Sequence, residues 1–149
     1  MTTRNKRWLL VGAILLLLAA TGALIENSTT EKQIAEISQQ HPLVVLNQLA
    51  KLDNRSEIFD QLQMLKQAVD RKRLALHQQE SYHPELLATS IYLRDALAHL
   101  PETLDEITDC LRIRSAIEYD YRTPIEEFEE PIPKLWLVIE KFCFEEQSS

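Results

Sequence analysis

The first feature of the hydrophobic pattern is an uninterrupted apolar run over residues 8–25, WLLVGAILLLLAATGALI, which carries no charged side chain. A run of this length is at the lower end of what crosses the hydrocarbon core of a bilayer as a helix. Inside lipid a helix also satisfies its own backbone N–H and C=O groups. We therefore predict that residues 8–25 form one transmembrane helix, which anchors the chain.

The charges on the two sides of this run differ in sign. The basic residues before it are Arg4, Lys6 and Arg7, and the first acidic residues after it are Glu26 and Glu31. Because positively charged flanks stay on the cytoplasmic side, we expect a cytoplasmic N-terminus and a single pass through the inner (plasma) membrane. Everything from residue 26 onward would then be periplasmic or otherwise extracytoplasmic.

A cleaved signal peptide is the alternative interpretation of the same run. A basic start, an apolar stretch and the small residues at positions 20–23 are the parts that such a peptide needs. The length of the run favours retention as an anchor. Cleavage would instead release a secreted helical binding protein.

The rest of the chain, residues 26–149, has a helical pattern and predicts one small domain. Both glycines lie in the apolar run, so this domain lacks the residue that hairpin turns most require. Leu, Glu, Gln, Ala and Lys dominate it, and they favour helix. The fold class is therefore all-α: a transmembrane helix followed by a bundle of about five helices. The apolar periodicity places helices near 29–40, 43–52, 55–80, 84–99, 102–117 and 133–146.

Several helix starts are indicated by capping chemistry. Ser28 with Glu31 fits a capping box, and Asn54 with Glu57 is a looser version of it. Proline is common in a first helical turn, where its missing N–H is not needed. The prolines that precede an apolar-periodic stretch are Pro42, Pro84, Pro101 and Pro133. His41-Pro42 and His83-Pro84 also suggest a repeat, but proline-started helices look alike without one.

One helix carries a regular heptad seam. Its members are Ile58, Leu62, Leu65, Val69 and Leu76, and Lys72 is the only break. Such a seam packs against another helix. We expect it to lie in the core of the bundle, with a homodimer through the same seam as the alternative.

The segment 118–132 interrupts the helical pattern with two prolines and dense acid. We predict an extended loop that crosses the bundle, with aromatic anchors and an acidic surface. The aromatic residues are Tyr119, Tyr121 and Phe128, and the acidic ones are Glu126, Glu127, Glu129 and Glu130. A long irregular stretch of this kind either binds a partner or simply connects two helices.

Cys110 and Cys143 are the only cysteines. In an oxidising compartment a pair of thiols in a small domain suggests a disulfide. Both residues fall beside apolar positions of their predicted helices, so an intramolecular bond is the main expectation. An intermolecular disulfide and free buried thiols stay open.

Composition excludes several functions. Without residues 1–25 the chain has 13 basic and 23 acidic residues, a net charge of −10, and this disfavours nucleic acid as a partner. The glycine-free domain has no phosphate-binding loop, and its scattered histidines form no zinc motif. The four glutamates of the acidic segment lack EF-hand spacing. We therefore expect no catalytic residues, no cofactor and no metal.

The remaining hypothesis is a non-enzymatic accessory or adaptor protein that binds a larger membrane or envelope assembly. By architecture alone, the anchor, the heptad seam and the two cysteines resemble the inner-membrane spanins of phage lysis. The several short helices depart from that pattern. A disulfide-tied helical bundle resembles the pilotins of secretion systems, whose lipid-bearing cysteine is missing here. Either resemblance implies a self-associating structural or regulatory membrane protein.

Overall fold

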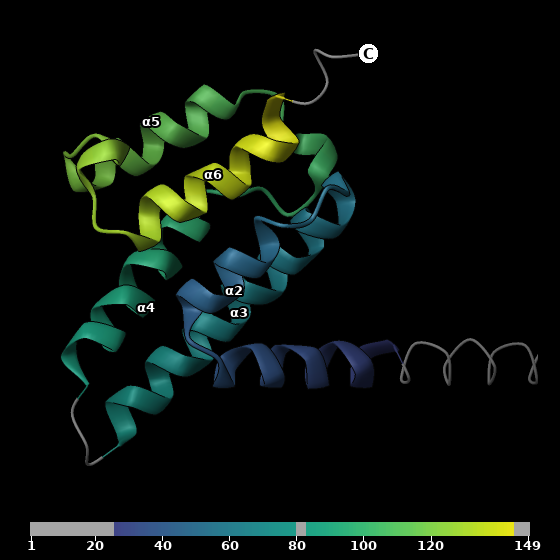
Figure 1. Cartoon of the computed structure of the whole chain (residues 1–149), viewed down its shortest axis with the longest axis vertical. Helices are drawn as coiled ribbons and strands as arrows, with labels where there is room; N and C mark the ends of the chain where they lie inside the picture. The colour runs from purple at the N-terminus through teal and green to yellow at the C-terminus, as the bar shows by residue number, and fades with distance from the viewer. Residues whose placement is uncertain (1–25, 80–82, 145–149) are drawn as a thin grey trace, which may run out of the picture. The chain divides into compact units, whose positions relative to one another are not determined.

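The computed structural model describes residues 26–79 and 83–144 (Figure 1). Within these ranges the protein is all-α, with six α-helices and no strand. The chain divides into two compact units, residues 1–33 and 34–149. Of the first unit, residues 26–33 are described, and they are helical. None of the helices in the described ranges has the length and apolarity to cross a bilayer. The predicted anchor, residues 8–25, lies outside those ranges.

The second unit holds the bundle. The helix that includes residues 26–33 ends at residue 39. The elements that follow are α2 (Pro42–Leu49), α3 (Arg55–Gln78), α4 (Pro84–Leu97), the 3₁₀ turn η1 (Leu104–Glu106), α5 (Cys110–Tyr121), the 3₁₀ turn η2 (Ile125–Glu127) and α6 (Pro131–Phe144).

Capping explains where most helices begin. Pro42 and Pro84 each stand in the first turn of their helix, as predicted. The Asn54 side chain accepts a hydrogen bond from the Glu57 backbone N–H at 3.0 Å, which confirms the predicted start of α3. Ser28 is different: the chain is already helical at residue 26, so its assignment as a cap was wrong.

The predicted helix 102–117 was wrong at both ends. Pro101 starts no helix, because η1 intervenes and α5 begins only at Cys110. Asp109 sets that start, since its carboxylate accepts from the Arg112 backbone N–H at 3.2 Å. Arg122, in the left-handed conformation with φ of 52°, ends the helix four residues later than predicted.

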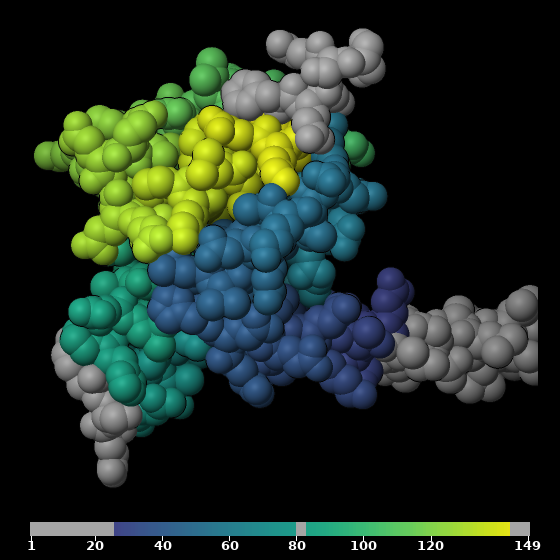
Figure 2. Space-filling view, viewed as in Figure 1, coloured from purple at the N-terminus to yellow at the C-terminus, as the bar shows by residue number. Residues whose placement is uncertain are grey.

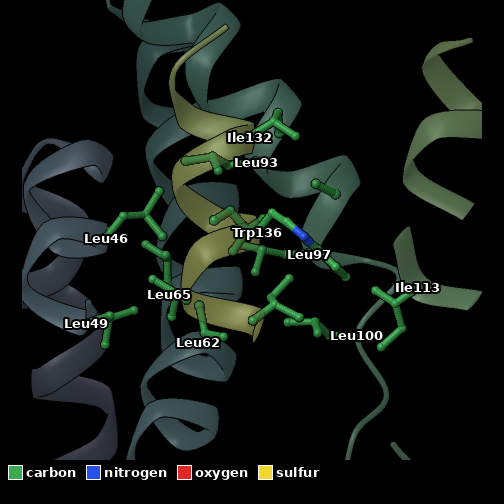
Figure 3. Packing of buried hydrophobic residues seen from close by; sticks show 14 of the residues in the cluster. Leu46, Leu49, Leu62, Leu65, Leu93, Leu97, Leu100, Ile113, Ile132 and Trp136 are labelled. Atoms are coloured by element: carbon green, nitrogen blue, oxygen red, sulfur yellow. The ribbon is translucent and has the colours of Figure 1, made fainter. Parts of the chain in front are cut away.

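Helix α6 occupies the centre of the packing. It contacts α2, α3 and α4, while α3 and α4 form an antiparallel pair along one another (Figure 1). It begins at Pro131 rather than at the predicted Pro133. Its buried residues include Ile132, Leu135, Val138, Ile139 and Phe142, each at most 1 % exposed. Figure 3 shows Ile132 and Trp136 among leucines of α2, α3 and α4.

The heptad seam of α3 lies inside this core. Its five members, Ile58, Leu62, Leu65, Val69 and Leu76, are all buried, and Phe59 beside them makes an edge contact with Phe142 at 5.9 Å between ring centroids. The seam therefore packs within the molecule, as the main expectation had it. It offers no surface for the alternative, a homodimer through the same residues.

We predict that Leu65→Ala lowers the free energy of unfolding by about 2–5 kcal/mol, because it leaves a cavity in the core. Leu137→Ala is the matched control: Leu137 is 60 % exposed on α6, and its truncation should change stability by less than about 0.5 kcal/mol. Urea unfolding followed by circular dichroism measures both. Equal losses for the two variants would contradict the burial of the seam.

Candidate partner-binding groove

A groove lies where the first turns of α2, α4 and α6 meet. Its main cavity has a volume of about 540 Å³. A second cavity, of about 290 Å³, shares His41, Pro84 and Glu85 with it. The main cavity is lined by His41, Leu43, Pro84, Glu85, Ala88, Thr89, Glu129, Glu130 and Pro131. We call the two together the N-terminal groove.

The position of this groove follows from proline. Pro42, Pro84 and Pro131 each begin a helix, and the parallel course of α2 and α6 brings two of these starts side by side. Proline has no N–H to satisfy at a helix start, and its ring presents apolar surface. The lining of the groove accordingly includes apolar residues, namely Leu43, Pro84, Ala88 and Pro131.

Carboxylates line the same groove beside these apolar residues. Glu85 lies in the first turn of α4, while Glu129 and Glu130 stand immediately before α6. Negative charge is favourable there because the N-terminal end of a helix carries a partial positive charge. Glu130 also forms an ion pair with Lys134 at 2.6 Å. Glu85 and Glu129 are exposed and have no ion pair among the described residues, so both can meet a cationic partner.

The predicted extended loop 118–132 is instead compact. Residues 118–121 are the last turn of α5, and η2 occupies three of the remaining positions. Figure 2 shows this part of the chain in lime beside α6 in yellow. Tyr119 is 83 % exposed, so its assignment as an anchor was wrong. Tyr121 and Phe128 do anchor the segment, with an edge contact at 5.2 Å between their ring centroids.

Tyr121 is held between two aromatic rings. Its second edge contact is with Tyr92 of α4, at 5.8 Å. Burial raises the pKa of Tyr121, and the nearby negative charge of Asp95 adds to the effect. The phenol therefore stays protonated at neutral pH and serves packing rather than proton transfer.

Glu126 fixes the segment to α5. Unlike Glu85 and Glu129, it is already paired and so is less available to a partner. Its carboxylate accepts from the Arg114 guanidinium, and this hydrogen bond lowers the pKa of Glu126. Arg114 also pairs with Glu118 at 3.1 Å and lies over the Trp136 ring, 5.4 Å from its centroid. Of the four predicted acidic contacts, Glu127 and Glu129 remain exposed without an ion pair among the described residues.

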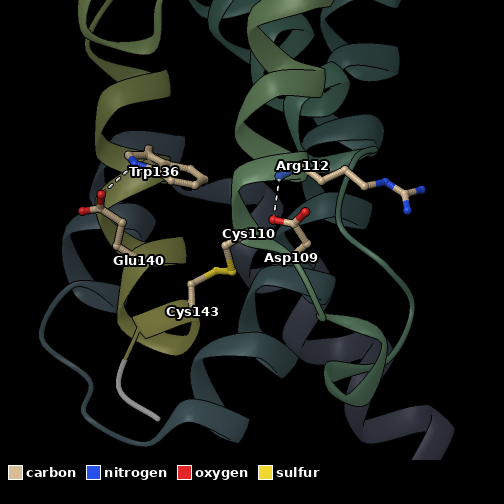
Figure 4. The surroundings of a disulfide bond; sticks show 6 residues. All are labelled: Asp109, Cys110, Arg112, Trp136, Glu140 and Cys143. Carbon is tan, nitrogen blue, oxygen red and sulfur yellow. Dashed lines mark hydrogen bonds between the residues drawn. A yellow bond between two sulfur atoms is a disulfide. The ribbon is translucent and has the colours of Figure 1, made fainter. Parts of the chain in front are cut away.

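The two cysteines form the disulfide Cys110–Cys143, with Cα atoms 5.9 Å apart (Figure 4). Cys110 is the first residue of α5, and Cys143 is in the last turn of α6. The bond therefore joins the start of α5 to the end of the central helix. Its intramolecular form was the main expectation from sequence.

In the described part of the chain no group of His, Cys, Asp and Glu side chains could hold a metal ion. His99 Nε2 lies 2.6 Å from an Asp120 carboxylate oxygen, which links the end of α4 to α5. His99, but not Asp120, lines a cavity of about 470 Å³ next to the start of α5. A histidine and a carboxylate alone supply no nucleophile.

Sequence reasoning missed Glu85 and His41 as groove residues. The sequence feature that could have pointed to the groove is the pair of His-Pro steps, His41-Pro42 and His83-Pro84. We interpreted their similarity as a coincidence of two helices that begin with proline. In the structure His41 and His83 line the same small cavity, although their helices are 42 residues apart in the chain. Proline-started helices thus meet here through packing rather than through a repeat.

Comparison with known proteins adds no relative: no protein-family model matches the chain, and neither curated proteins nor solved structures show a significant match.

We predict that removal of the disulfide lowers the free energy of unfolding by about 3–4 kcal/mol. The reason is that the unfolded chain gains conformational entropy once the loop between the two cysteines, which are 33 residues apart, is no longer closed. Cys110→Ser, Cys143→Ser and the double variant should lose similar amounts, because each removes the same cross-link. Denaturant unfolding without reductant measures the loss. If the free energy of unfolding of the double variant falls by the sum of the two single losses, the cysteines contribute separately. That result would contradict a shared cross-link.

Proposed function

We propose that the protein is a non-enzymatic adaptor, anchored in the inner (plasma) membrane by residues 8–25. Its helical bundle lies on the extracytoplasmic side and binds a protein of a membrane or envelope assembly. The N-terminal groove receives a partner segment that carries Lys or Arg beside apolar side chains. The observation that carries this proposal is a groove lined both by apolar residues and by the exposed carboxylates of Glu85 and Glu129.

Charge and shape support a cationic peptide as the occupant. Opposite charges at the rim of a groove steer association and fix the register of the bound segment. The apolar lining residues supply area that such a contact buries, and the net charge of −10 beyond residue 25 extends the attraction around the site. Glu127 lies in η2, just before the rim, and is exposed as well.

Two features support the extracytoplasmic placement. The apolar run with its basic flank has the pattern of a signal-anchor with the N-terminus inside. The disulfide Cys110–Cys143 is of the kind that persists in oxidising compartments and is rare in the cytosol. The bundle beyond the anchor therefore suits the periplasm or an equivalent space.

A photo-crosslinking amino acid at Thr89, which lines the groove, tests the site in native membranes. We predict a discrete protein adduct that Glu85→Lys with Glu129→Lys reduces at least about tenfold, because the two carboxylates then repel a cationic segment. Glu102→Lys with Asp105→Lys is the matched control, with the same change of net charge at exposed positions away from the groove. An adduct that both pairs weaken equally would contradict a specific groove.

The anchor is tested separately by alkaline extraction of membranes. We predict that the full chain stays in the membrane pellet with its N-terminus intact by mass spectrometry. Leu16→Arg with Leu17→Arg should release it, since each central arginine costs about 2.5–3.5 kcal/mol of insertion. Leu16→Ile with Leu17→Ile is the control and should stay in the pellet. A chain shortened near residue 23 would show a cleaved signal peptide instead.

A further inference from the structure

Helix α5 is held less firmly than the other helices of the bundle. Helices α2, α3, α4 and α6 pack against one another, whereas the main contacts of α5 are with α6 and η2 (Figure 1). The buried residues of α5 are Cys110, Ile113 and Ile117, so two aliphatic side chains and one cysteine enter the core. The contacts that α2, α3, α4 and α6 make with one another therefore do not involve α5.

The start of α5 borders a cavity on the side that faces α4. This cavity, of about 470 Å³, lies between the end of α4, at Ala98 and His99, and the first turns of α5, at Arg112 and Ile113. A void supplies no packing contacts to the side chains that line it. The disulfide of Cys110 is therefore the strongest link between the start of α5 and the core.

The other links of α5 are one aromatic cluster and several ion pairs. Tyr121, its last residue, makes edge contacts with Tyr92 and Phe128. Arg114 pairs with Glu126, whose side chain is 66 % exposed, and such ion pairs add little to stability. A helix of 12 residues is also marginal in water on its own, so α5 should unfold when it leaves α6.

We propose that the disulfide is a redox-sensitive switch, whose reduction lets α5 open while α2, α3, α4 and α6 stay folded together. Segments with few buried apolar contacts can open as local units below the global free energy of unfolding. Loss of the bond also frees the loop between two cysteines 33 residues apart, and this gain in entropy favours the open form. Selective opening of α5 comes in addition to the general loss of stability.

The reductant that this step requires is a dithiol. Cys143 is partly exposed whereas Cys110 is buried, so a thiolate of the dithiol attacks the Cys143 sulfur. The attack forms a mixed disulfide on Cys143 and releases Cys110 as a thiolate, which takes up a proton. The second thiol of the reductant then displaces Cys143, which takes up the other proton. The products are two cysteine thiols and one oxidised dithiol.

Opening of α5 would uncover Trp136 on α6. This side chain is 5 % exposed and projects from α6 toward α5 (Figure 4). The Arg114 guanidinium lies over its ring, 5.4 Å from the centroid. The indole N–H donates to Glu140 of the same helix at 2.8 Å, so the ring keeps its position when α5 leaves. The reduced form therefore presents apolar surface at Trp136 that the oxidised form covers.

Hydrogen exchange measured by mass spectrometry tests the switch on the full chain in detergent, before and after treatment with dithiothreitol. We expect reduction to speed the exchange of α5 amides at least about tenfold more than that of α3 amides, because only α5 depends on the bond. The Cys110→Ser/Cys143→Ser variant should match the reduced protein and show no response to dithiothreitol. Leu65→Ala, with the bond intact, is the matched control for a general loss of stability and should not speed α5 more than α3.

The fluorescence of Trp136 gives a second readout, in a Trp8→Phe background that leaves one tryptophan. We expect reduction to shift its emission to the red and to increase quenching by acrylamide, and reoxidation to reverse both. Far-UV circular dichroism should keep most of the helical signal. Equal acceleration of exchange in α5 and α3, unchanged Trp136 emission, or loss of all helical signal on reduction would overturn the inference. These readouts involve neither the groove nor the anchor, so the switch holds or fails independently of the proposed function.

Discussion

The burial of α6 is the constraint on which the bundle depends. This helix inserts an almost wholly apolar face between α2, α3 and α4 and contacts all three, while α3 also packs directly against α2 and α4. Short amphipathic helices are marginal alone, so each of them is stable only while α6 covers its apolar side. Lys141 adds a polar link, since its ammonium donates to the Ala50 and Leu52 carbonyls at the end of α2 at 2.5 and 2.8 Å.

Lysine plays the same part at a second helix end. Lys72 is the one break in the heptad seam of α3, and its ammonium donates to the Ser38 and Gln40 carbonyls at 3.1 and 3.0 Å. These carbonyls end the helix that precedes α2, where a cation is favourable. Burial lowers the pKa of Lys72, while the two hydrogen bonds hold its charged form. The break in the apolar pattern therefore marks a capping contact rather than a defect in the core.

Sequence patterns predicted the helices well where local chemistry decides the outcome. The α3 seam, the Asn54 cap and the proline starts of α2 and α4 depend on neighbouring residues, and all are found in the structure. Prediction failed between residues 101 and 133, where tertiary contacts decide. The edge contact of Phe128 with Tyr121 and the ion pairs of Arg114 draw this segment into turns, and no periodicity records such contacts.

The groove could not be predicted for the same reason. Its carboxylates come from α4 and from the approach to α6, 44 residues apart, and only packing brings them together. Acidity alone pointed to residues 126–130, of which Glu126 and Glu130 are engaged by Arg114 and Lys134.

Helix α6 also connects the groove with the disulfide. Its first turn forms one wall of the groove, and its last turn holds the start of α5 through Cys143. One buried helix thus forms a wall of the groove at its first turn and holds the start of α5 at its last turn.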